Sequence, residues 1–215
     1  NMNYASIPYD IDKYPFVKII QELLGTENLE LVDEKHEGLF QVGNDSKTSF
    51  HDLFYNKYRS GWEEMEKAYN DFIADIVAPT INEDFLVQKF PTFRVHLNSN
   101  VAVGAFHKDA DFNHPKGEIN FVLPLTNSKD TASIWVESEP DKGDFEPMDM
   151  KVGEYIQFNG NELTHGNKVN DTGFTRVSMD FRILPLSMYH PEQNTESVTR
   201  KTKFVDGEYY KLFKK

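Results

Sequence analysis

Residues 174–184 read FTRVSMDFRIL, and polar and apolar side chains alternate along this stretch. The polar or charged positions from 176 onward are Arg176, Ser178, Asp180 and Arg182. Because successive side chains of a β-strand point to opposite faces, these four share one face and the apolar residues between them share the other. The stretch therefore predicts a half-buried strand with one apolar face and one face that carries a row of charges.

Six stretches upstream have the composition and length of short strands. They are residues 85–90, 92–97, 101–107, 118–123, 133–137 and 154–158, and Asn, Asp, Gly and Pro residues separate them. Many short strands without helices between them are typical of an antiparallel sandwich or barrel. The second half of the chain is therefore predicted to be mainly β.

The first third of the chain has helical spacing instead. Apolar residues recur at helical intervals in residues 16–24, with Pro15 suited to a first turn and Gly25 to a stop. Residues 50–58 predict a second helix. We expect both helices to pack against the β-sheets through their apolar faces.

A third helix is predicted to begin at a capping box formed by Ser60 and Glu63 and to end before Pro79. Its inward-facing positions are Trp62, Met65, Tyr69, Phe72, Ile73 and Ile76. We expect these residues to belong to the core and not to a ligand site.

The chain is predicted to form one domain with three parts. Residues 1–80 would be a helical buttress, residues 85–184 a β core, and residues 185–215 a polar tail. In the tail, Asp206-Gly207 predicts a β-hairpin. Three roles stay open for the tail, namely a lid, a dimer contact or an appended edge of the sheet.

Composition and charge limit the classes of function. The chain has 215 residues, a formal net charge of −12 and no cysteine. The negative charge opposes attraction to nucleic acid and to anionic membranes, and no apolar run reaches membrane length. Without cysteine, His, Asp and Glu are the strong metal-ligand side chains that remain. We expect a cytoplasmic monomer or homodimer with a small-molecule substrate and with neither nucleic-acid nor membrane partners.

His107-Lys108-Asp109 is a candidate metal-binding motif. In an extended strand His107 and Asp109 point to the same face, while Lys108 points away. His165, which follows the strand predicted at 154–158, is a candidate third ligand from a distant part of the chain. Two imidazoles and one carboxylate on one face of a metal leave its other positions open for a cosubstrate and oxygen.

His114 offers a rival pairing with Asp109 or with Asp111. Because Pro115 follows it in an irregular stretch, we interpret His114 as a loop residue near the entrance of the site.

Three separated pieces of the chain together resemble the Fe(II)/2-oxoglutarate-dependent oxygenase superfamily. That superfamily combines His-x-Asp, a second His several dozen residues later, and Arg-x-Ser a short distance beyond it. The matching pieces are His107-Lys108-Asp109, His165 and Arg176-Val177-Ser178. A Gly-Asp pair that often precedes the second His is Gly153-Glu154 here, a conservative departure. Within the superfamily, the chain resembles small biosynthetic hydroxylases of the streptomycin-pathway and phytanoyl types.

The resemblance implies a double-stranded β-helix, or jelly-roll, that is buttressed by the helices. It implies that His107, Asp109 and His165 hold Fe(II) as the catalytic centre, with 2-oxoglutarate and O2 as cosubstrates and succinate and CO2 as products. By the same transfer, Arg176 pairs with the distal carboxylate of 2-oxoglutarate and Ser178 assists it. A guanidinium presents a planar fork that suits a carboxylate. Since halogenases of this superfamily lack the carboxylate ligand, Asp109 argues against halogenation.

Four more residues are candidates for contacts in the site. Asn120 is predicted to lie beside the iron and 2-oxoglutarate. Trp135 points opposite to Ile134 and Val136, and it is predicted either to form an aromatic plug in the barrel or to wall the substrate pocket. Arg182 has two interpretations, an internal pair with Asp180 or another acid, or a contact with an anionic substrate. Arg94 is predicted either to contact substrate or to be solvated on an outer face.

The expected function is hydroxylation of a small metabolite, such as an amino acid derivative or a secondary-metabolite intermediate. Members of the superfamily that act on peptides or nucleic acids often carry extra recognition elements, and this chain has little beyond a barrel, its helices and a short tail. Desaturation, cyclisation and epimerisation use the same ligands and stay open. A non-catalytic, metal-binding cupin-like protein is one alternative, but it does not explain Arg-x-Ser. An oxygenase that acts on a protein side chain is another, and it would need a wide groove at the mouth.

Overall fold

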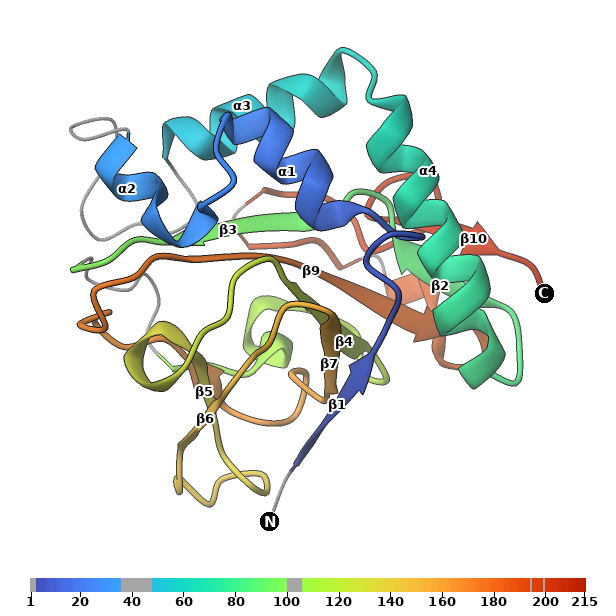
Figure 1. The fold of residues 1–215 in the computed structure, drawn as a ribbon. Helices are drawn as coiled ribbons and strands as arrows, with labels where there is room; N and C mark the ends of the chain where they lie inside the picture. The colour runs from blue at the N-terminus through green and yellow to red at the C-terminus, as the bar shows by residue number, and fades with distance from the viewer. Residues whose placement is uncertain (1–2, 36–47, 100–105, 194, 199) are drawn as a thin grey trace.

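The computed structural model describes residues 3–35, 48–99, 106–193, 195–198 and 200–215. Two antiparallel β-sheets and a layer of helices make up the fold (Figure 1). The large sheet contains, in spatial order, β1 (Tyr4–Pro8), β7 (Glu154–Phe158), β4 (Ile119–Pro124), β9 (Arg176–Pro185), β2 (Phe85–Gln88) and β10 (Tyr210–Phe213). Strand β3 (Thr92–His96) also pairs with β9. The small sheet contains β6 (Glu146–Met148), β5 (Ile134–Val136) and β8 (His165–Gly166).

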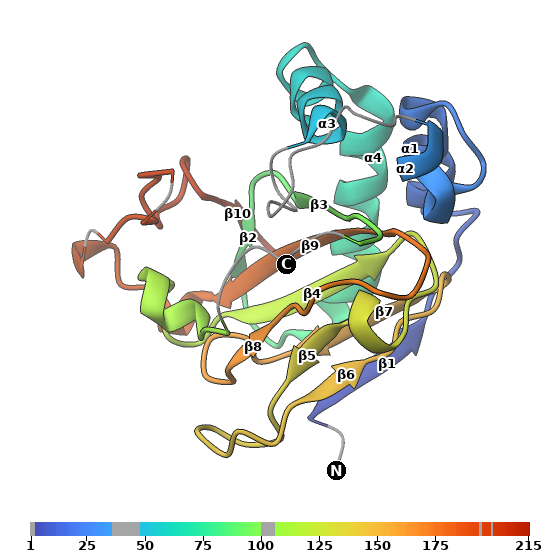
Figure 2. The same ribbon diagram turned by 90° about the vertical axis from the view of Figure 1, so that its left-hand side faces the viewer.

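The helices cover one face of the large sheet, and the small sheet lies on the opposite side (Figure 2). We call the helix-covered face the outer face and the other the inner face. Val122, Ile156 and Phe158 of the inner face pack with apolar residues of β5 and β6. Among the described strands, no pairing closes the two sheets into a barrel. The prediction of a mainly β fold with N-terminal helices is confirmed.

The alternation in β9 divides its side chains between these two faces. Its apolar members belong to the core shared with the helices, and they are Val177, Met179, Phe181 and Ile183. The neighbouring strands have the same parity, since Phe93 of β3 and Phe121 of β4 lie in that core as well. The polar positions of β9 are therefore left on the inner face.

Among the described residues, four α-helices form the outer layer. They are α1 (Phe16–Leu24), α2 (Val32–Lys35), α3 (Ser49–Arg59) and α4 (Glu63–Phe72). Helix α1 has the predicted bounds, and Gly25 ends it in a left-handed conformation with φ 68°. A π-helix, Ile73–Val77, continues α4, and the short 3-10 helices are Leu29–Leu31, Ala78–Thr80, Asp109–Phe112, Asp130–Ala132, Leu186–Met188 and Pro191–Gln193.

The capping box predicted at Ser60 is wrong. Ser60 ends α3 with φ −87° and ψ −2°, and its Oγ donates to the Lys57 carbonyl at 3.0 Å. Helix α4 begins later, at Glu63, after Trp62, which makes no side-chain cap hydrogen bond. The Ser60 hydroxyl thus caps the end of α3 and not the start of α4. The sequence did not distinguish these two roles, because only three residues separate the helices.

Most predicted strands are present with shifted ends. The strand predicted at 154–158 is β7 with the same bounds, and the long strand at 174–184 is β9, which begins at Arg176. Of the stretch 101–107, residues 101–105 lie outside the described residues. Strands β1, β6, β8 and β10 were not among the predicted strands.

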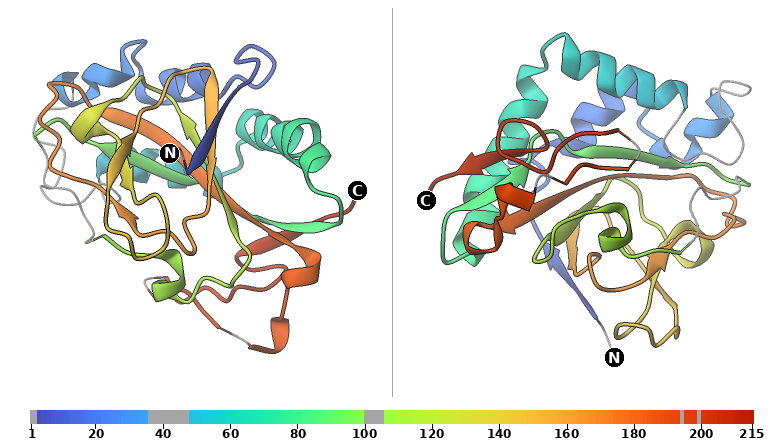
Figure 3. Two further views of the ribbon diagram at one scale, coloured as in Figure 1. Left: turned by 90° about the horizontal axis from the view of Figure 1, so that it is seen from below. Right: turned by 180° about the vertical axis from the view of Figure 1, so that it is seen from behind.

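The C-terminal segment ends as an added edge of the large sheet. Strand β10 pairs antiparallel with β2 (Figure 3). The predicted turn forms, since Gly207 has φ 91° and the Glu208 N–H donates to the Val205 carbonyl at 3.2 Å. The predicted hairpin is wrong, because the strand after the turn pairs with β2. Of the three roles left open, the structure supports the appended edge.

Within the described part of the chain, no helix has both the length and the apolar character needed to cross a membrane.

Candidate metal centre

His107, Asp109 and His165 converge on one point. One ligand atom from each lies within 4.8 Å of the others. Nε2 of His107 lies 3.5 Å from Asp109 Oδ1, and Nε2 of His165 lies 3.4 Å from the same oxygen. Two nitrogen donors and one oxygen donor with open space around them suit a transition metal that keeps exchangeable positions. The structure therefore brings together the three residues that the motif predicted.

The backbone sets the separation of the two histidines. The His107 N–H donates to the His165 carbonyl at 2.9 Å, and the His165 N–H donates to the His107 carbonyl at 3.0 Å. The two residues thus form an isolated antiparallel bridge next to β8. Nδ1 of His165 lies 2.9 Å from the Leu163 carbonyl, which leaves Nε2 as the metal-facing nitrogen. Ligand geometry here depends on main-chain hydrogen bonds.

The His-x-Asp motif is extended only in part. Lys108 has φ −97° and ψ 145°, and its Nζ lies 2.7 Å from Asp141 Oδ1, away from the ligands. Asp109 then begins a short 3-10 helix, Asp109–Phe112. The prediction that His107 and Asp109 face the same side is confirmed, although a turn replaces the continuous strand at Asp109.

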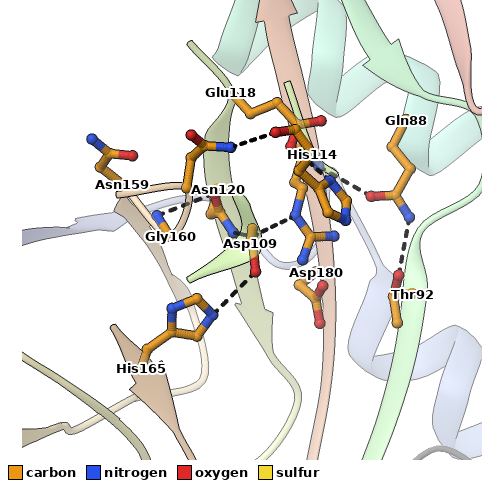
Figure 4. Close-up of polar contacts among 12 residues, drawn as sticks. Gln88, Thr92, Asp109, His114, Glu118, Asn120, Asn159, Gly160, His165 and Asp180 are labelled. Carbon is orange, nitrogen blue, oxygen red and sulfur yellow. Dashed lines mark hydrogen bonds and ion pairs between the residues drawn. The ribbon is translucent and has the colours of Figure 1, made fainter. Parts of the chain in front are cut away.

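Asp109 is 1% exposed, and its two carboxylate oxygens face different partners. Asn120 Nδ2 and Arg182 Nε each lie 2.8 Å from Oδ2, while Oδ1 faces the two imidazoles. Figure 4 shows Asp109 between Asn120 and His165. Burial alone would raise the pKa of this carboxyl, but the Arg182 guanidinium and the two histidines hold it well below its usual range. A charged carboxylate with a fixed orientation therefore faces the metal position.

Asn120 acts as a bridge between Asp109 and the loop before His165. Its Oδ1 accepts the Gly160 N–H at 3.2 Å, while its Nδ2 donates to Asp109. A Cβ at Gly160 would lie 2.6 Å from Asn120 Nδ2 and 3.1 Å from His165 Cε1. Asn120 therefore lies beside a candidate metal ligand and lines the neighbouring cavity, and its contact with 2-oxoglutarate stays a prediction. The need for glycine at position 160 was not recognised from the sequence.

Arg176 and Ser178 lie on the inner face of β9, and both are 0% exposed. Arg176 Nη1 donates to the Ala132 carbonyl at 2.9 Å, and Nη2 donates to Asn167 Oδ1 at 3.0 Å. The Ser178 Oγ is buried without a hydrogen-bond partner among the described residues. His96 faces Arg176 across the β3–β9 pair, and burial, followed by the Arg176 charge, lowers its pKa to about 3. The inner face therefore combines a cation, a neutral imidazole and a hydroxyl with unused capacity.

A cavity runs from the ligands along the inner face. Its lining includes His107 and His165 at one end and Arg176 of β9. Arg94 and Asp180 also line it, and Arg94 Nε lies 2.6 Å from Asp180 Oδ2. Arg94 is thus on the inner face and not on a solvated outer one. The cavity therefore lies between the two candidate histidine ligands and Arg176, whereas Ser178 is buried and is not among its lining residues.

Arg182 and Trp135 were both candidates for substrate contacts. Arg182 forms the internal pair that was one of its two interpretations, with Asp109 as the acid, so its guanidinium supports a ligand carboxylate. The prediction for Trp135 needs correction. Trp135 lies opposite to Ile134, which lines the cavity, and the Lys168 Nζ sits 3.6 Å above its ring. Alternation in β5 therefore turns Trp135 away from the site.

His114 belongs to a different cluster. Its Nδ1 lies 2.7 Å from Glu118 Oε1, and the group of metal-ligating side chains found among the described residues does not include it. The loop position predicted for His114 is confirmed, since it follows the 3-10 helix that starts at Asp109.

Comparisons with known proteins find a relative that is similar in sequence and solved structures that are similar in fold. The chain is 33% identical over 207 residues to the streptomycin biosynthesis protein StrG of Streptomyces griseus, a match that covers 96% of this chain and 97% of StrG. No protein-family model matches the chain.

Three solved structures with the same fold are distant from this chain in sequence. The nickel complex of the non-haem monooxygenase ThoJ has a TM-score of 0.55 at 13% identity and covers 85% of this chain and 74% of ThoJ. The α-ketoglutarate-dependent carbocyclase SnoK of nogalamycin biosynthesis has a TM-score of 0.52 at 9% identity, covering 98% and 91%. HygX of Streptomyces hygroscopicus, with nickel and 2-oxoglutarate bound, has a TM-score of 0.50 at 10% identity, covering 86% and 83%.

Proposed function

Because this chain belongs to the family of the streptomycin biosynthesis protein StrG and has the fold of the Fe(II)/2-oxoglutarate-dependent oxygenases, we propose that it oxidises a small metabolite with Fe(II), 2-oxoglutarate and O2. The observation that carries the proposal is the arrangement of His107, Asp109 and His165 around one point. The resemblance inferred from the motifs is confirmed at the level of the fold.

The donor set fits Fe(II). His107 Nε2, His165 Nε2 and Asp109 Oδ1 would hold the ion, and the second oxygen of Asp109 is already occupied by Asn120 and Arg182. Because the carboxylate is charged and cannot rotate freely, it offers the ion one oxygen. When bound, Fe(II) with 2-oxoglutarate supplies the activation of O2 that oxidation of a C–H bond requires.

The inner face of β9 fits 2-oxoglutarate. Arg176 would bind the distal carboxylate, and the Ser178 hydroxyl, which is buried without a partner among the described residues, can donate a further hydrogen bond. Both residues lie on the strand face that lines the cavity next to the ligands, and the neutral His96 adds no second positive charge. These features support a site for a dicarboxylate between β9 and the metal position.

We propose hydroxylation as the reaction. It balances when one atom of O2 enters the substrate C–H bond and the other enters succinate, while CO2 leaves from 2-oxoglutarate. The chain contributes by holding Asp109 as a carboxylate, by orienting His165 through the Leu163 carbonyl, and by enclosing the cosubstrate position within the protein. SnoK, a carbocyclase with this fold, makes cyclisation the second candidate reaction.

The proposed substrate is a polar intermediate of secondary metabolism. StrG is named for streptomycin biosynthesis, which supports this class. The Arg94–Asp180 pair in the cavity also supports it, because together these side chains offer donors and acceptors to a substrate with hydroxyl or amino groups.

An anaerobic titration tests the proposal. Metal-free protein is mixed with Fe(II) and 2-oxoglutarate, and the visible charge-transfer band of the keto acid bound to iron is recorded. We expect a band in the parent protein and a weaker one in Arg176→Ala. Arg59→Ala, at the exposed end of α3, is the matched control and should give the parent band.

Binding of iron without the band would favour the non-catalytic, cupin-like alternative. A band would justify a screen of amino-sugar, cyclitol and amino acid derivatives for substrate-stimulated succinate release, with mass analysis of the product. A product heavier by one oxygen atom supports hydroxylation, whereas loss of two hydrogens indicates cyclisation or desaturation.

A further inference from the structure

The C-terminal segment contacts the support of the metal ligand. Tyr209, just before β10, has its hydroxyl 3.2 Å from Arg182 Nη1, and Arg182 Nε is the group that donates to Asp109 Oδ2. The Lys89 N–H donates to the Tyr209 carbonyl at 2.8 Å, which anchors this residue to the end of β2. A residue close to the end of the sequence is therefore two hydrogen bonds away from a candidate metal ligand.

The orientation of the Gln88 side-chain amide determines which partner the Tyr209 hydroxyl donates to and which it accepts from. Its Nε2 donates to the Phe90 carbonyl at 2.7 Å and to Thr92 Oγ1 at 3.0 Å, which fixes the amide orientation (Figure 4). Its Oε1 must therefore be the atom that accepts the Tyr209 hydroxyl at 3.0 Å. The tyrosine oxygen is left as an acceptor, which is what the Arg182 guanidinium requires.

Burial raises the pKa of Tyr209, so its hydroxyl stays protonated and can donate to Gln88 while it accepts from Arg182. Arg182 is thus held from both sides, by Tyr209 at Nη1 and by Asp109 at Nε. Its backbone N–H also donates to Gln88 Oε1 at 3.2 Å. These contacts leave the guanidinium little freedom to leave Asp109.

Tyr210, the residue after Tyr209, is connected to the backbone of Asp109 through Glu118 and His114. Tyr210 donates a hydrogen bond to Glu118 Oε2, and Glu118 Oε1 is 2.7 Å from His114 Nδ1. The His114 N–H in turn donates to the carbonyl of Asp109 at 3.3 Å. Two adjacent tyrosines of the C-terminal segment therefore contact both the side-chain and the backbone support of Asp109.

We infer that Tyr209 is a positioning residue of the metal centre, which acts through Arg182 to keep Asp109 Oδ1 directed at the ion. The inference rests on the proposed function, because it assumes that Asp109 is a metal ligand. Loss of the Tyr209 hydroxyl leaves one Arg182 N–H without its acceptor, and Asp109 then gains alternative orientations that bind metal less well. The lost hydrogen bond has a charged donor, but it acts on the ion only through Arg182, so we expect about a fivefold weaker metal affinity.

The test is a double-mutant cycle with Co(II) as a coloured probe of the site. Dissociation constants and visible spectra are measured for the parent, Tyr209→Phe, Arg182→Met and the double variant. We expect about fivefold weaker binding for Tyr209→Phe, roughly 10–100-fold for Arg182→Met, and no added loss in the double variant. Tyr14→Phe is the matched control, because it removes a tyrosine hydroxyl that donates to Asp75 in the helical layer.

The inference would be overturned if Tyr209→Phe bound Co(II) as tightly as the parent. It would also be overturned if Tyr209→Phe weakened Co(II) binding fivefold both in the parent and in the Arg182→Met background. If Arg182→Met does not fold, Arg182→Lys takes its place in the cycle. Failure of the parent protein itself to bind Co(II) would overturn the proposed function and this inference with it, so the two failures are distinguishable.

Discussion

The two faces of the large sheet are built from the same strands but stabilised in different ways. On the outer face, Phe181 stacks on Phe121 with ring centroids 5.1 Å apart and meets Tyr69 edge-on at 5.3 Å. On the inner face, Arg182 and Asp180, the residues flanking Phe181, each form an ion pair with a residue of another element. An apolar residue in the core can be replaced by another of similar volume at a small cost in stability. Each charge on the inner face depends on one particular partner of opposite charge.

The comparison separates two kinds of mutational effect. Changes on the outer face should lower the free energy of unfolding and leave metal affinity unchanged in the folded fraction. Changes on the inner face should lower metal or cosubstrate affinity as well, because the same hydrogen bonds that satisfy buried charges also orient the ligands.

Asp109→Ala should have the largest effect, because it removes a ligand and leaves the Arg182 guanidinium without its carboxylate. We expect no detectable Co(II) binding and a loss of about 3–5 kcal/mol in the free energy of unfolding, measured by denaturant titration. Asp71→Ala, which breaks the exposed pair with Lys67 on α4, is the control and should cost under about 1 kcal/mol. Retained Co(II) binding would remove Asp109 from the ligand set.

Phe181→Ala should cost a similar free energy of unfolding, about 3–5 kcal/mol, by leaving a cavity between the sheet and α4. Because Phe181 points away from the ligands, the Co(II) dissociation constant of the folded variant should stay within about twofold of the parent. A large loss of metal affinity would contradict the separation between the two faces.

His96 should make stability depend on pH. The folded protein holds the pKa of His96 at about 3, so between pH 6.5 and 3 the unfolded chain binds a proton that the folded chain does not. Stability is therefore lost as pH falls below 6.5, and this residue should account for about 2 kcal/mol between pH 7 and pH 5. His96→Leu should remove that part of the pH dependence. Equal slopes in the two proteins would show that His96 titrates normally.

Gly160→Ala should have the smallest effect on stability and a selective effect on the site. A Cβ at this position meets Asn120 Nδ2 at 2.6 Å, so the amide must move away from Asp109. We expect about tenfold weaker Co(II) binding. Gly173→Ala is the control, since it strains a backbone with φ 89° where nothing lies within 4 Å, and it should leave the metal affinity unchanged.

The elements predicted correctly are those in which the spacing of apolar and polar residues within the element is enough to identify it. The alternation in β9 placed Arg176 and Ser178 on one face, and Pro15 and Gly25 delimited α1. The missed strands have no such pattern, because β1 and β6 are short, contain Pro8 and Pro147, and gain their order from partner strands.

The contacts around the metal ligands could be predicted only in part. Residue types identified His107, Asp109 and His165, but the partner of Arg182 depends on how a loop and a strand meet in space. Asn120 and Gly160 are distant in sequence, and only the folded chain brings them within hydrogen-bond distance. Alternation separates Trp135 from Ile134, but the pattern of β5 alone does not decide which of its two faces lines the cavity.

The reciprocal hydrogen bonds between the His107 and His165 backbones have a consequence for folding kinetics. The two histidines are far apart in the chain, so the site exists only after a long loop has closed and the small sheet has formed. A metal ion cannot act as a nucleus for such a fold. Bound metal should therefore slow the unfolding rate and leave the refolding rate nearly unchanged, which makes metal capture a reporter of the last step of folding.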